Sequence, residues 1–155
     1  MDKARIYTEL LQEIRSVLQG EDDEIARMSS VCAILKRGLP WASWVGFYRE
    51  IAPRLLAVGP YQGEMGCLRI PFDRGVCGAA ARTGVTQVVP DVHAFEGHIA
   101  CDSTARSEIV VPVRDRSGRV FAVLDLDSRL PAAFDEIDRS YLETVANEIP
   151  LPARS

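Results

Sequence analysis

The sequence predicts a single α+β domain in which a mainly antiparallel β-sheet is flanked by helices. The chain has 155 residues, a length typical of one domain. Its apolar residues follow a helical period near both ends, and its middle consists of short segments rich in β-formers between glycines and prolines. We therefore expect one domain over 1–155, with N-terminal helices at about 5–37, the sheet and active-site loops at about 42–128 and a C-terminal helix at about 135–149.

Two helices are predicted at the N-terminus. Apolar residues recur at steps of three and four from Tyr7 to Leu18, which places them on one face of a helix. Asp22 or Asp23 can cap a second helix, which ends near Gly38. Cys32 falls on the apolar face of this second helix and is therefore expected in the core.

The middle of the chain is expected to supply four strands and one short helix. An Ala-rich stretch from Gly75 to Arg82 predicts the helix, because alanine favours helical structure. The predicted strands are Ser43 to Arg49, Leu55 to Val58, Cys67 to Ile70 and Val85 to Val89.

A β-hairpin is predicted from Glu108 to Ser128. Its strands flank the polar, Gly-containing turn 115–118. Counting outward from the turn sets Arg114 opposite Arg119, and Glu108 then falls near Asp125 with Asp127 within two residues. Apolar residues from 135 to 149 predict a closing helix.

Charge and hydropathy exclude two classes of partner. The 18 basic and 22 acidic residues give a net charge of −4, and the basic residues are scattered rather than gathered into a stripe, so nucleic acid is not expected as a partner. No apolar run approaches the ~20 residues that cross a bilayer, and the start of the chain does not resemble a signal peptide. A cytoplasmic protein is expected, in which four cysteines are thiols, metal ligands or redox groups rather than a permanent disulfide framework.

The segment from Pro90 to Ser107 shows no sustained period. Long irregular segments of compact domains are often binding loops or lids. This one carries His93, His98 and Cys101.

Three cysteines, Cys67, Cys77 and Cys101, fall in different predicted elements, so only the fold can bring them together. They are open to three interpretations. They can be buried apolar residues, or zinc ligands together with His93 or His98, or a redox set in which one thiol becomes a sulfenic acid and another condenses with it.

Carboxylates and aromatic residues add candidates for a site. Asp125 and Asp127 alternate along an apolar strand and therefore share one face. If that face is buried, burial and like charge raise their pKa and keep a proton available near neutral pH; the alternative is that they face solvent or accept backbone hydrogen bonds. Trp44 and Tyr48 also share a face, either as core residues or as an aromatic wall.

Taken together, several segments resemble the free methionine-(R)-sulfoxide reductases, a family built on a GAF-type domain. The resemblance spans most of the chain, and the set as a whole is specific. It rests on Trp41–Tyr48, Gly59–Gly63, Cys67–Ile70, Arg74–Gly78, His98–Asp102, Arg106–Pro112 and Leu124–Ser128.

The resemblance implies a role for each candidate residue. Cys101 would be the attacking thiol, Cys67 its resolving partner in an intramolecular disulfide, and Cys77 a third, auxiliary thiol. The remaining residues would bind the substrate: Glu108, Asp125 and Asp127 around the sulfoxide and the amine, with Glu108 and Asp127 also assisting catalysis, and Trp44 and Tyr48 around the methyl end.

The resemblance also implies partners. No cofactor or metal is expected; the reducing equivalents would come from an external dithiol such as thioredoxin, and a homodimer is suggested. Two other classes compete with the reductase: a GAF-type sensor that binds a small ligand without catalysis, and a zinc-stabilised structural domain.

Overall fold

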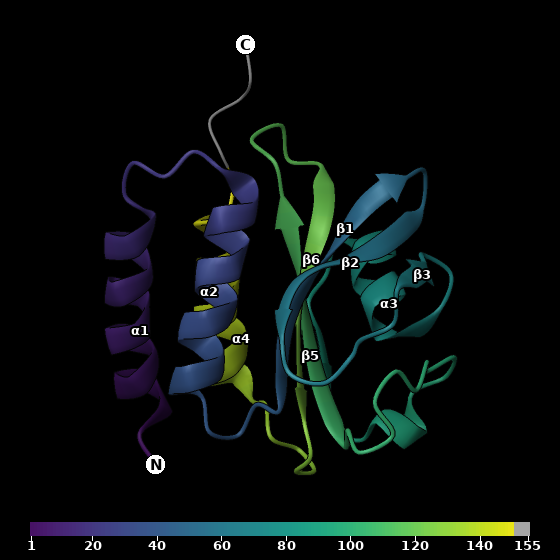
Figure 1. The fold of residues 1–155 in the computed structure, drawn as a ribbon. Helices are drawn as coiled ribbons and strands as arrows, with labels where there is room; N and C mark the ends of the chain where they lie inside the picture. Colours follow the sequence, from purple (N-terminus) through teal and green to yellow (C-terminus); the bar gives the residue numbers. More distant parts are fainter. Residues whose placement is uncertain (151–155) are drawn as a thin grey trace.

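The computed structural model describes residues 1–150 and has three layers (Figure 1). Helices α2 and α4 cover one face of a six-stranded antiparallel sheet, with α1 packed against these two helices, and α3 lies on the other face. The strand order is β3-β2-β1-β6-β5-β4. The helices are α1 (Lys3–Leu18), α2 (Glu24–Gly38), α3 (Gly75–Thr83), α4 (Glu136–Asn147) and the 3₁₀ turn η1 (Val92–Ala94); the strands are β1 (Trp44–Ala52), β2 (Leu55–Gln62), β3 (Arg69–Pro71), β4 (Gln87–Val89), β5 (Ser107–Arg114) and β6 (Val120–Ser128).

The α+β class and the order of elements are confirmed, and the differences lie at element ends. The expected domain ran to residue 155, and its last five residues fall outside the described part of the chain. Cys67 was expected to begin a strand, but β3 starts only at Arg69, so that cysteine lies in the β2–β3 loop. Within residues 1–150, none of the helices combines the length and apolar character needed to cross a membrane.

Side-chain caps begin three of the helices. Asp2 accepts a hydrogen bond from the backbone N–H of Arg5, and Asp23, rather than Asp22, accepts one from Ala26 at the start of α2. Asp135 and Asp138 form a reciprocal capping box at α4.

A buried carboxylate joins the N-terminal helix to the rest of the fold. Asp138 is fully buried on α4 and accepts hydrogen bonds from the Tyr7 hydroxyl at 2.6 Å and the Trp41 indole N–H at 3.0 Å. It also forms an ion pair with Lys3 of α1. Because hydrogen bonds and an ion pair compensate the burial of this carboxylate, it stabilises the packing of α1 on α4.

The β5–β6 hairpin is confirmed, but its register differs from the expected one. Arg114 pairs with Val120, and the pairing shifts between Val113 and Arg114 at a β-bulge. Glu108 consequently lies opposite Asp127, while Asp125 lies opposite Val110. The count from the turn was therefore off by two residues at the far end, although the three carboxylates still gather there.

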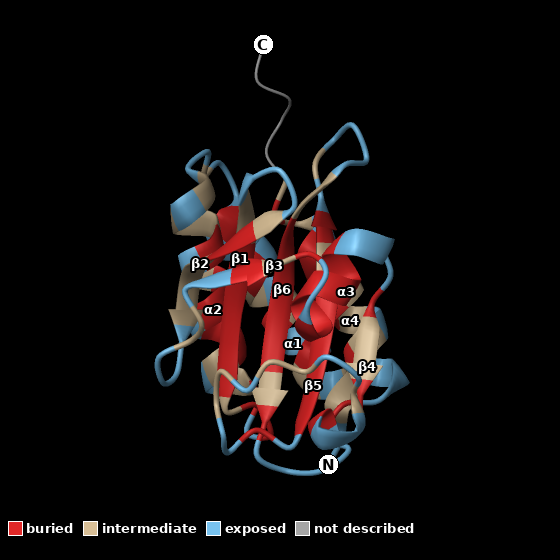
Figure 2. Cartoon of the chain, turned by 90° about the vertical axis from the view of Figure 1, so that its right-hand side faces the viewer, coloured by how far each residue is buried: buried red, intermediate tan, exposed pale blue. Residues whose placement is uncertain are grey.

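Both faces of the sheet are buried at its centre (Figure 2). On the helical face, α1, α2 and α4 enclose the larger apolar cluster, which includes Cys32 as expected. On the opposite face, α3 covers a smaller cluster and leaves one end of β1, β6 and β5 to other elements. This uncovered end, between α3 and the segment 90–106, is where the candidate site lies.

Candidate active site

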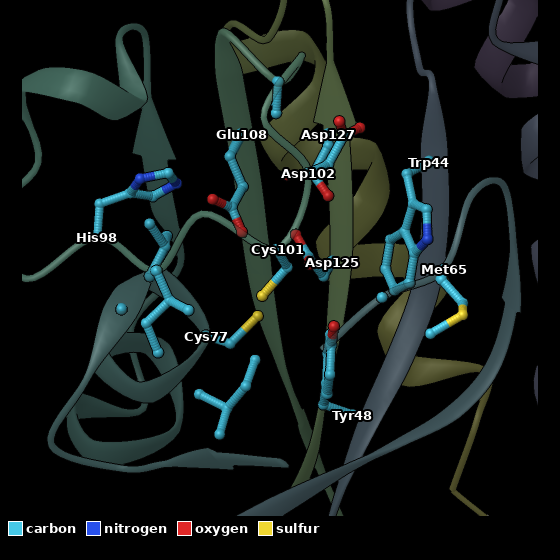
Figure 3. Close-up of a pocket in the computed structure, with 16 residues that line it drawn as sticks. Trp44, Tyr48, Met65, Cys77, His98, Cys101, Asp102, Glu108, Asp125 and Asp127 are labelled. Atoms are coloured by element: carbon cyan, nitrogen blue, oxygen red, sulfur yellow. The ribbon is translucent and has the colours of Figure 1, made fainter. Parts of the chain in front are cut away.

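A pocket opens between the sheet, the start of α3 and the segment 90–106 (Figure 3). Carboxylates from β5 and β6 lie at its centre, with Trp44 on one side and His98 on the other. Its lining consists of Trp44, Tyr48, Met65, Gly66, Ile70, Gly75, Val76, Cys77, His98, Ile99, Cys101, Asp102, Ala105, Glu108, Asp125 and Asp127.

Strand register brings the polar residues to one face. Trp44 pairs with Asp127 across β1 and β6, and Asp127 pairs with Glu108 across β6 and β5. Alternate residues of a strand share a face, so Tyr48 points the same way as Trp44, four residues before it, and Asp125 points the same way as Asp127, two residues after it. The sheet therefore presents three acids and two aromatic rings to one pocket.

The aromatic wall contains a third ring. Trp44 stacks on Tyr48 with ring centroids 5.8 Å apart and on Tyr61 with centroids 5.2 Å apart. The indole N–H of Trp44 donates to the carbonyl of Glu64 at 2.8 Å, which fixes the ring plane. A Cβ atom at Gly46 would lie 2.5 Å from the Cβ of Tyr61 and still closer to the indole ring of Trp44, so the wall needs glycine there.

The carboxyl groups are buried and unpaired with any cation. Glu108 is 6% exposed and Asp125 4% exposed, and Asp127 is partly buried. Burial raises the pKa of Glu108, Asp125 and Asp127 well above its usual range, and their mutual repulsion raises it further. The Oδ1 atom of Asp125 is buried and has no hydrogen-bond partner. Burial and crowding therefore favour the protonated form of these carboxyl groups, and Oδ1 of Asp125 is free to accept a hydrogen bond from a ligand.

Two of the cysteines form a disulfide at the pocket. Cys67, in the β2–β3 loop, is bonded to Cys101, with Cα atoms 5.2 Å apart, and Cys101 lines the pocket. Cys77, on α3, is a free and buried thiol that lines the same pocket as Cys101 (Figure 3). Burial and the nearby carboxylates raise the pKa of the Cys77 thiol well above its usual range. Cys77 is thus held as a thiol, whereas Cys101 is bonded to Cys67.

The segment carrying Cys101 is attached to its surroundings by backbone hydrogen bonds. The N–H of Gly75, at the start of α3, donates to the carbonyl of Gly97 at 3.0 Å. The N–H of Arg106 donates to the carbonyl of Ser128 at 2.7 Å. Gly75 has φ = 69°, and a Cβ there would lie 3.3 Å from the side chain of Ile99, so the segment packs tightly on the helix end.

Histidine chemistry at the pocket is limited to one ring. His98 lines the pocket, and burial together with the neighbouring His93 lowers its pKa below the ordinary value. The zinc set considered from the sequence, three cysteines with a histidine, is not assembled within residues 1–150, because Cys67 and Cys101 are bonded to each other.

The structure brings all the expected site residues to this region. Seven of them line the pocket: Trp44, Tyr48, Cys77, Cys101, Glu108, Asp125 and Asp127. The eighth, Cys67, is joined to the pocket by its disulfide with Cys101. Four further residues lie at the site but were not predicted there from the sequence: Tyr61, Met65, Gly66 and Asp102. Tyr61 was missed because the predicted strand ended at Val58, whereas β2 continues to Gln62. The other three residues lie in loops, and their positions depend on loop conformation.

The architecture and the site together define the class of protein. The sequence profile of the GAF domain matches residues 21–150. The chain is 36% identical to the free methionine-R-sulfoxide reductase of Escherichia coli over 149 residues, which cover 96% of this chain and 89% of the relative. It is also 36% identical to the free methionine-R-sulfoxide reductase of Saccharomyces cerevisiae over 155 residues, with 96% and 86% covered.

A solved structure of a free methionine-R-sulfoxide reductase is also similar to this chain. The X-ray structure of the Neisseria meningitidis free methionine-R-sulfoxide reductase in complex with its substrate superimposes with a TM-score of 0.91 at 46% identity, covering 96% of this chain and 89% of that one. The chain therefore belongs to the free methionine-R-sulfoxide reductase family of GAF-domain proteins.

Proposed function

We propose that this protein reduces free L-methionine-(R)-sulfoxide to methionine with its own thiols. The observation that carries the proposal is the placement of Cys101, one half of a disulfide, in the same pocket as three crowded carboxyl groups. Sulfoxide reduction needs this combination, because the sulfur is a poor electrophile until its oxygen is protonated or strongly hydrogen-bonded. General acid assistance of this kind contributes ~10² to 10⁴ in rate.

The pocket has a place for each part of the substrate. The methyl group and the sulfur pack on the wall of Trp44 and Tyr48, since sulfur and methyl groups interact favourably with aromatic rings. The ammonium group donates to the carboxylates, and the unpartnered Oδ1 of Asp125 is its acceptor. The α-carboxylate lies beside His98, the one basic side chain of the lining, whose ring N–H can donate a hydrogen bond to it. A peptide-bound methionine sulfoxide lacks both charges, which restricts the pocket to the free amino acid.

The first chemical step transfers oxygen to Cys101. Its thiolate attacks the substrate sulfur while Glu108 or Asp127 gives a proton to the oxygen. The oxygen moves to the Cys101 sulfur, the substrate sulfur gains two electrons, and methionine and a cysteine sulfenic acid result. The high pKa of the crowded carboxyl groups makes a proton available for this step near neutral pH.

The second step forms the disulfide. The Cys67 thiolate attacks the sulfenic sulfur of Cys101, the S–O bond breaks, and the oxygen leaves as water with the proton of a neighbouring acid. An external dithiol, thioredoxin or a similar protein, then returns two electrons and two protons to the disulfide. Cys77 assists without being oxidised, because its buried thiol stays protonated beside Asp125. We further propose that the protein works as a homodimer without a bound cofactor.

Steady-state turnover tests the proposal. Purified protein is incubated with dithiothreitol and each epimer of free methionine sulfoxide, and methionine is quantified, with Cys101→Ser as the inactive control. Methionine formed from the R epimer alone is expected. Binding of the R epimer without any turnover would instead identify a ligand sensor and refute the reductase.

A further inference from the structure

Three potential metal ligands from three separate elements converge beneath the pocket. The Sγ of Cys77 on α3 and a carboxylate oxygen each of Glu108 on β5 and Asp125 on β6 all lie within 4.8 Å of one another. All three residues are buried. Within residues 1–150 this is the one such group of three or more histidines, cysteines or acids.

The group has an unmet need for positive charge. Asp125 Oδ1 is buried and has no hydrogen-bond partner, an arrangement that costs free energy until a donor or a cation arrives. No lysine or arginine lines the pocket, so the described side chains do not supply that charge. The substrate ammonium is one cation that fits; a metal ion is another.

We infer that the reduced protein binds Zn²⁺ through Cys77, Glu108 and Asp125, with the Cys101 thiolate as the fourth ligand. Cys77 is a thiol in the metal-free protein and releases its proton to solvent when the metal binds. The site is inhibitory rather than a resident cofactor site, because the ion takes the acids and the thiol that act on the substrate. The binding rests on the convergence of Cys77, Glu108 and Asp125 and on the pocket that Cys101 also lines; the inhibition rests on the proposed reductase function.

The donor set selects this kind of ion. Zn²⁺ binds thiolate at about 2.3 Å and carboxylate oxygen at about 2.0–2.2 Å, with tetrahedral geometry, so ligand atoms lie roughly 3.3–3.8 Å apart. The ligand atoms of Cys77, Glu108 and Asp125, within 4.8 Å of each other, need to close by about 1.5 Å at most. Mg²⁺ and Ca²⁺ prefer oxygen ligands in larger number and are disfavoured by the sulfur.

The redox state of the protein controls the site. In the oxidised chain Cys101 is bonded to Cys67 and cannot act as a ligand. Reduction breaks that bond and frees a second thiolate at the pocket, completing four ligands. Zn²⁺ bound in this way also masks the nucleophile, so the metal-bound chain is protected from sulfenic acid formation. The metal is therefore expected to bind the reduced protein and to leave the oxidised one.

Cobalt(II) is a spectroscopic probe for the site. The wild-type chain, reduced with a phosphine under anaerobic conditions, is titrated with Co²⁺, and thiolate-to-cobalt charge-transfer absorption is recorded before Zn²⁺ is added as a competitor. We expect one Co²⁺ per chain with this absorption, its loss on addition of Zn²⁺, and at least tenfold weaker binding to the oxidised chain.

Two cysteine variants locate the ligands. Cys77→Ser is expected to lower the charge-transfer absorption and to weaken binding at least tenfold. Cys32→Ser is the matched control, because Cys32 is also a free, buried cysteine but lies on the helical face of the sheet, where its thiol donates to the carbonyl of Pro60. This control is expected to bind Co²⁺ like the wild type. Glu108→Gln, which keeps both thiols, tests the carboxylate ligand and is expected to weaken binding without removing the absorption.

The optical result does not depend on turnover, so it separates this inference from the proposed function. Absence of the absorption in the reduced wild type, or an unchanged spectrum and affinity in Cys77→Ser, would overturn the zinc site even if the enzyme is fully active. In the turnover assay, Zn²⁺ is expected to raise the KM for methionine sulfoxide and leave kcat unchanged; inhibition that persists unaltered in Cys77→Ser would contradict the site as well.

Discussion

Glu108 and Asp127 lie directly opposite each other on β5 and β6, so two acids occupy neighbouring positions at one end of a buried sheet face. Such a pair is unfavourable in an empty site, because burial and like charge both disfavour ionisation. It becomes useful where one acid must give up a proton and another must hold a cation. The cost of placing these acids together is therefore the clearest sign that the site serves chemistry.

Replacing either acid separates a catalytic role from a structural one. Removing one carboxyl relieves repulsion, so Glu108→Gln and Asp127→Asn are expected to keep or raise the melting temperature. The reduction rate is expected to fall by ~10² or more, because a general acid is lost. Thermal unfolding and dithiothreitol-driven turnover measure the two effects. A lowered melting temperature with unchanged turnover would show that these residues are structural.

The raised pKa values predict a pH dependence of stability. A carboxyl group whose pKa is higher in the folded than in the unfolded chain takes up a proton on folding. Its stabilising contribution is complete below the ordinary carboxyl pKa of about 4 and is lost as the pH rises through the higher folded-state value. Between about pH 5 and pH 8, the melting temperature of the substrate-free wild type is therefore expected to fall more steeply than that of Glu108→Gln. Parallel curves for the two proteins would contradict the high pKa of Glu108.

The two disulfide cysteines are expected to differ in a single turnover. Without added reductant, Cys101→Ser should release no methionine, because the attacking thiolate is missing. Cys67→Ser should release about one methionine per chain and stop at the sulfenic acid. Rapid quenching and amino-acid analysis measure both. If Cys67→Ser were inert and Cys101→Ser released methionine, the assigned roles would be reversed.

Gly46 offers a test of the aromatic wall. Gly46→Ala places a methyl group against Trp44 and Tyr61, and such overpacking costs about 1–3 kcal/mol of stability. Displacing the indole should raise the KM for methionine sulfoxide and change tryptophan fluorescence. Gly118→Ala is the control for a destabilising Gly→Ala change away from the wall, because open space surrounds Gly118 but its φ of 88° strains an alanine. Equal KM values for the two variants would argue against a substrate-binding role for the wall.

Asp138 provides the converse case of a buried carboxylate with a structural role. Its partners include Tyr7, Trp41 and Lys3. Asp138→Asn removes the buried charge that these donors contact and leaves Lys3 with its ion pair to Asp135 at 3.4 Å. The free energy of unfolding is expected to fall by about 3 kcal/mol. Turnover per folded molecule, measured well below the melting temperature, is expected to stay at the wild-type value. A large drop in that turnover would link α4 to the site.

Local signals in the sequence were enough to predict most of the architecture. The N-terminal helices follow from period and from caps such as Asp23, and the hairpin follows from the turn at 115–118. The exact register did not follow, because a bulge next to Arg114 has no distinct local signature. The position of Cys67 in a loop was also missed. The apolar residues Leu68 and Ile70 after it fit a strand that begins at Cys67 as well as one that begins at Arg69.

The site was predictable in its residues but not in its arrangement. Alternation along β6 placed Asp125 and Asp127 on one face, and family resemblance implied the pairing of Cys67 with Cys101, which the structure contains. The approach of Cys77 to Asp125 depends on how α3 packs across the sheet, a tertiary contact that no local pattern encodes. The unpartnered oxygen of Asp125 could be recognised only from coordinates.

The most direct test of the proposed reductase is a single turnover followed on the protein itself. Fully reduced wild-type protein is mixed anaerobically with free methionine-(R)-sulfoxide, without any reductant, and methionine and disulfide-linked peptides are quantified together. One methionine per chain and one new disulfide, joining Cys67 to Cys101, are predicted, with no reaction of the S epimer. Failure to form methionine from the R epimer, or a disulfide that joins Cys77 instead of Cys67, would contradict the account.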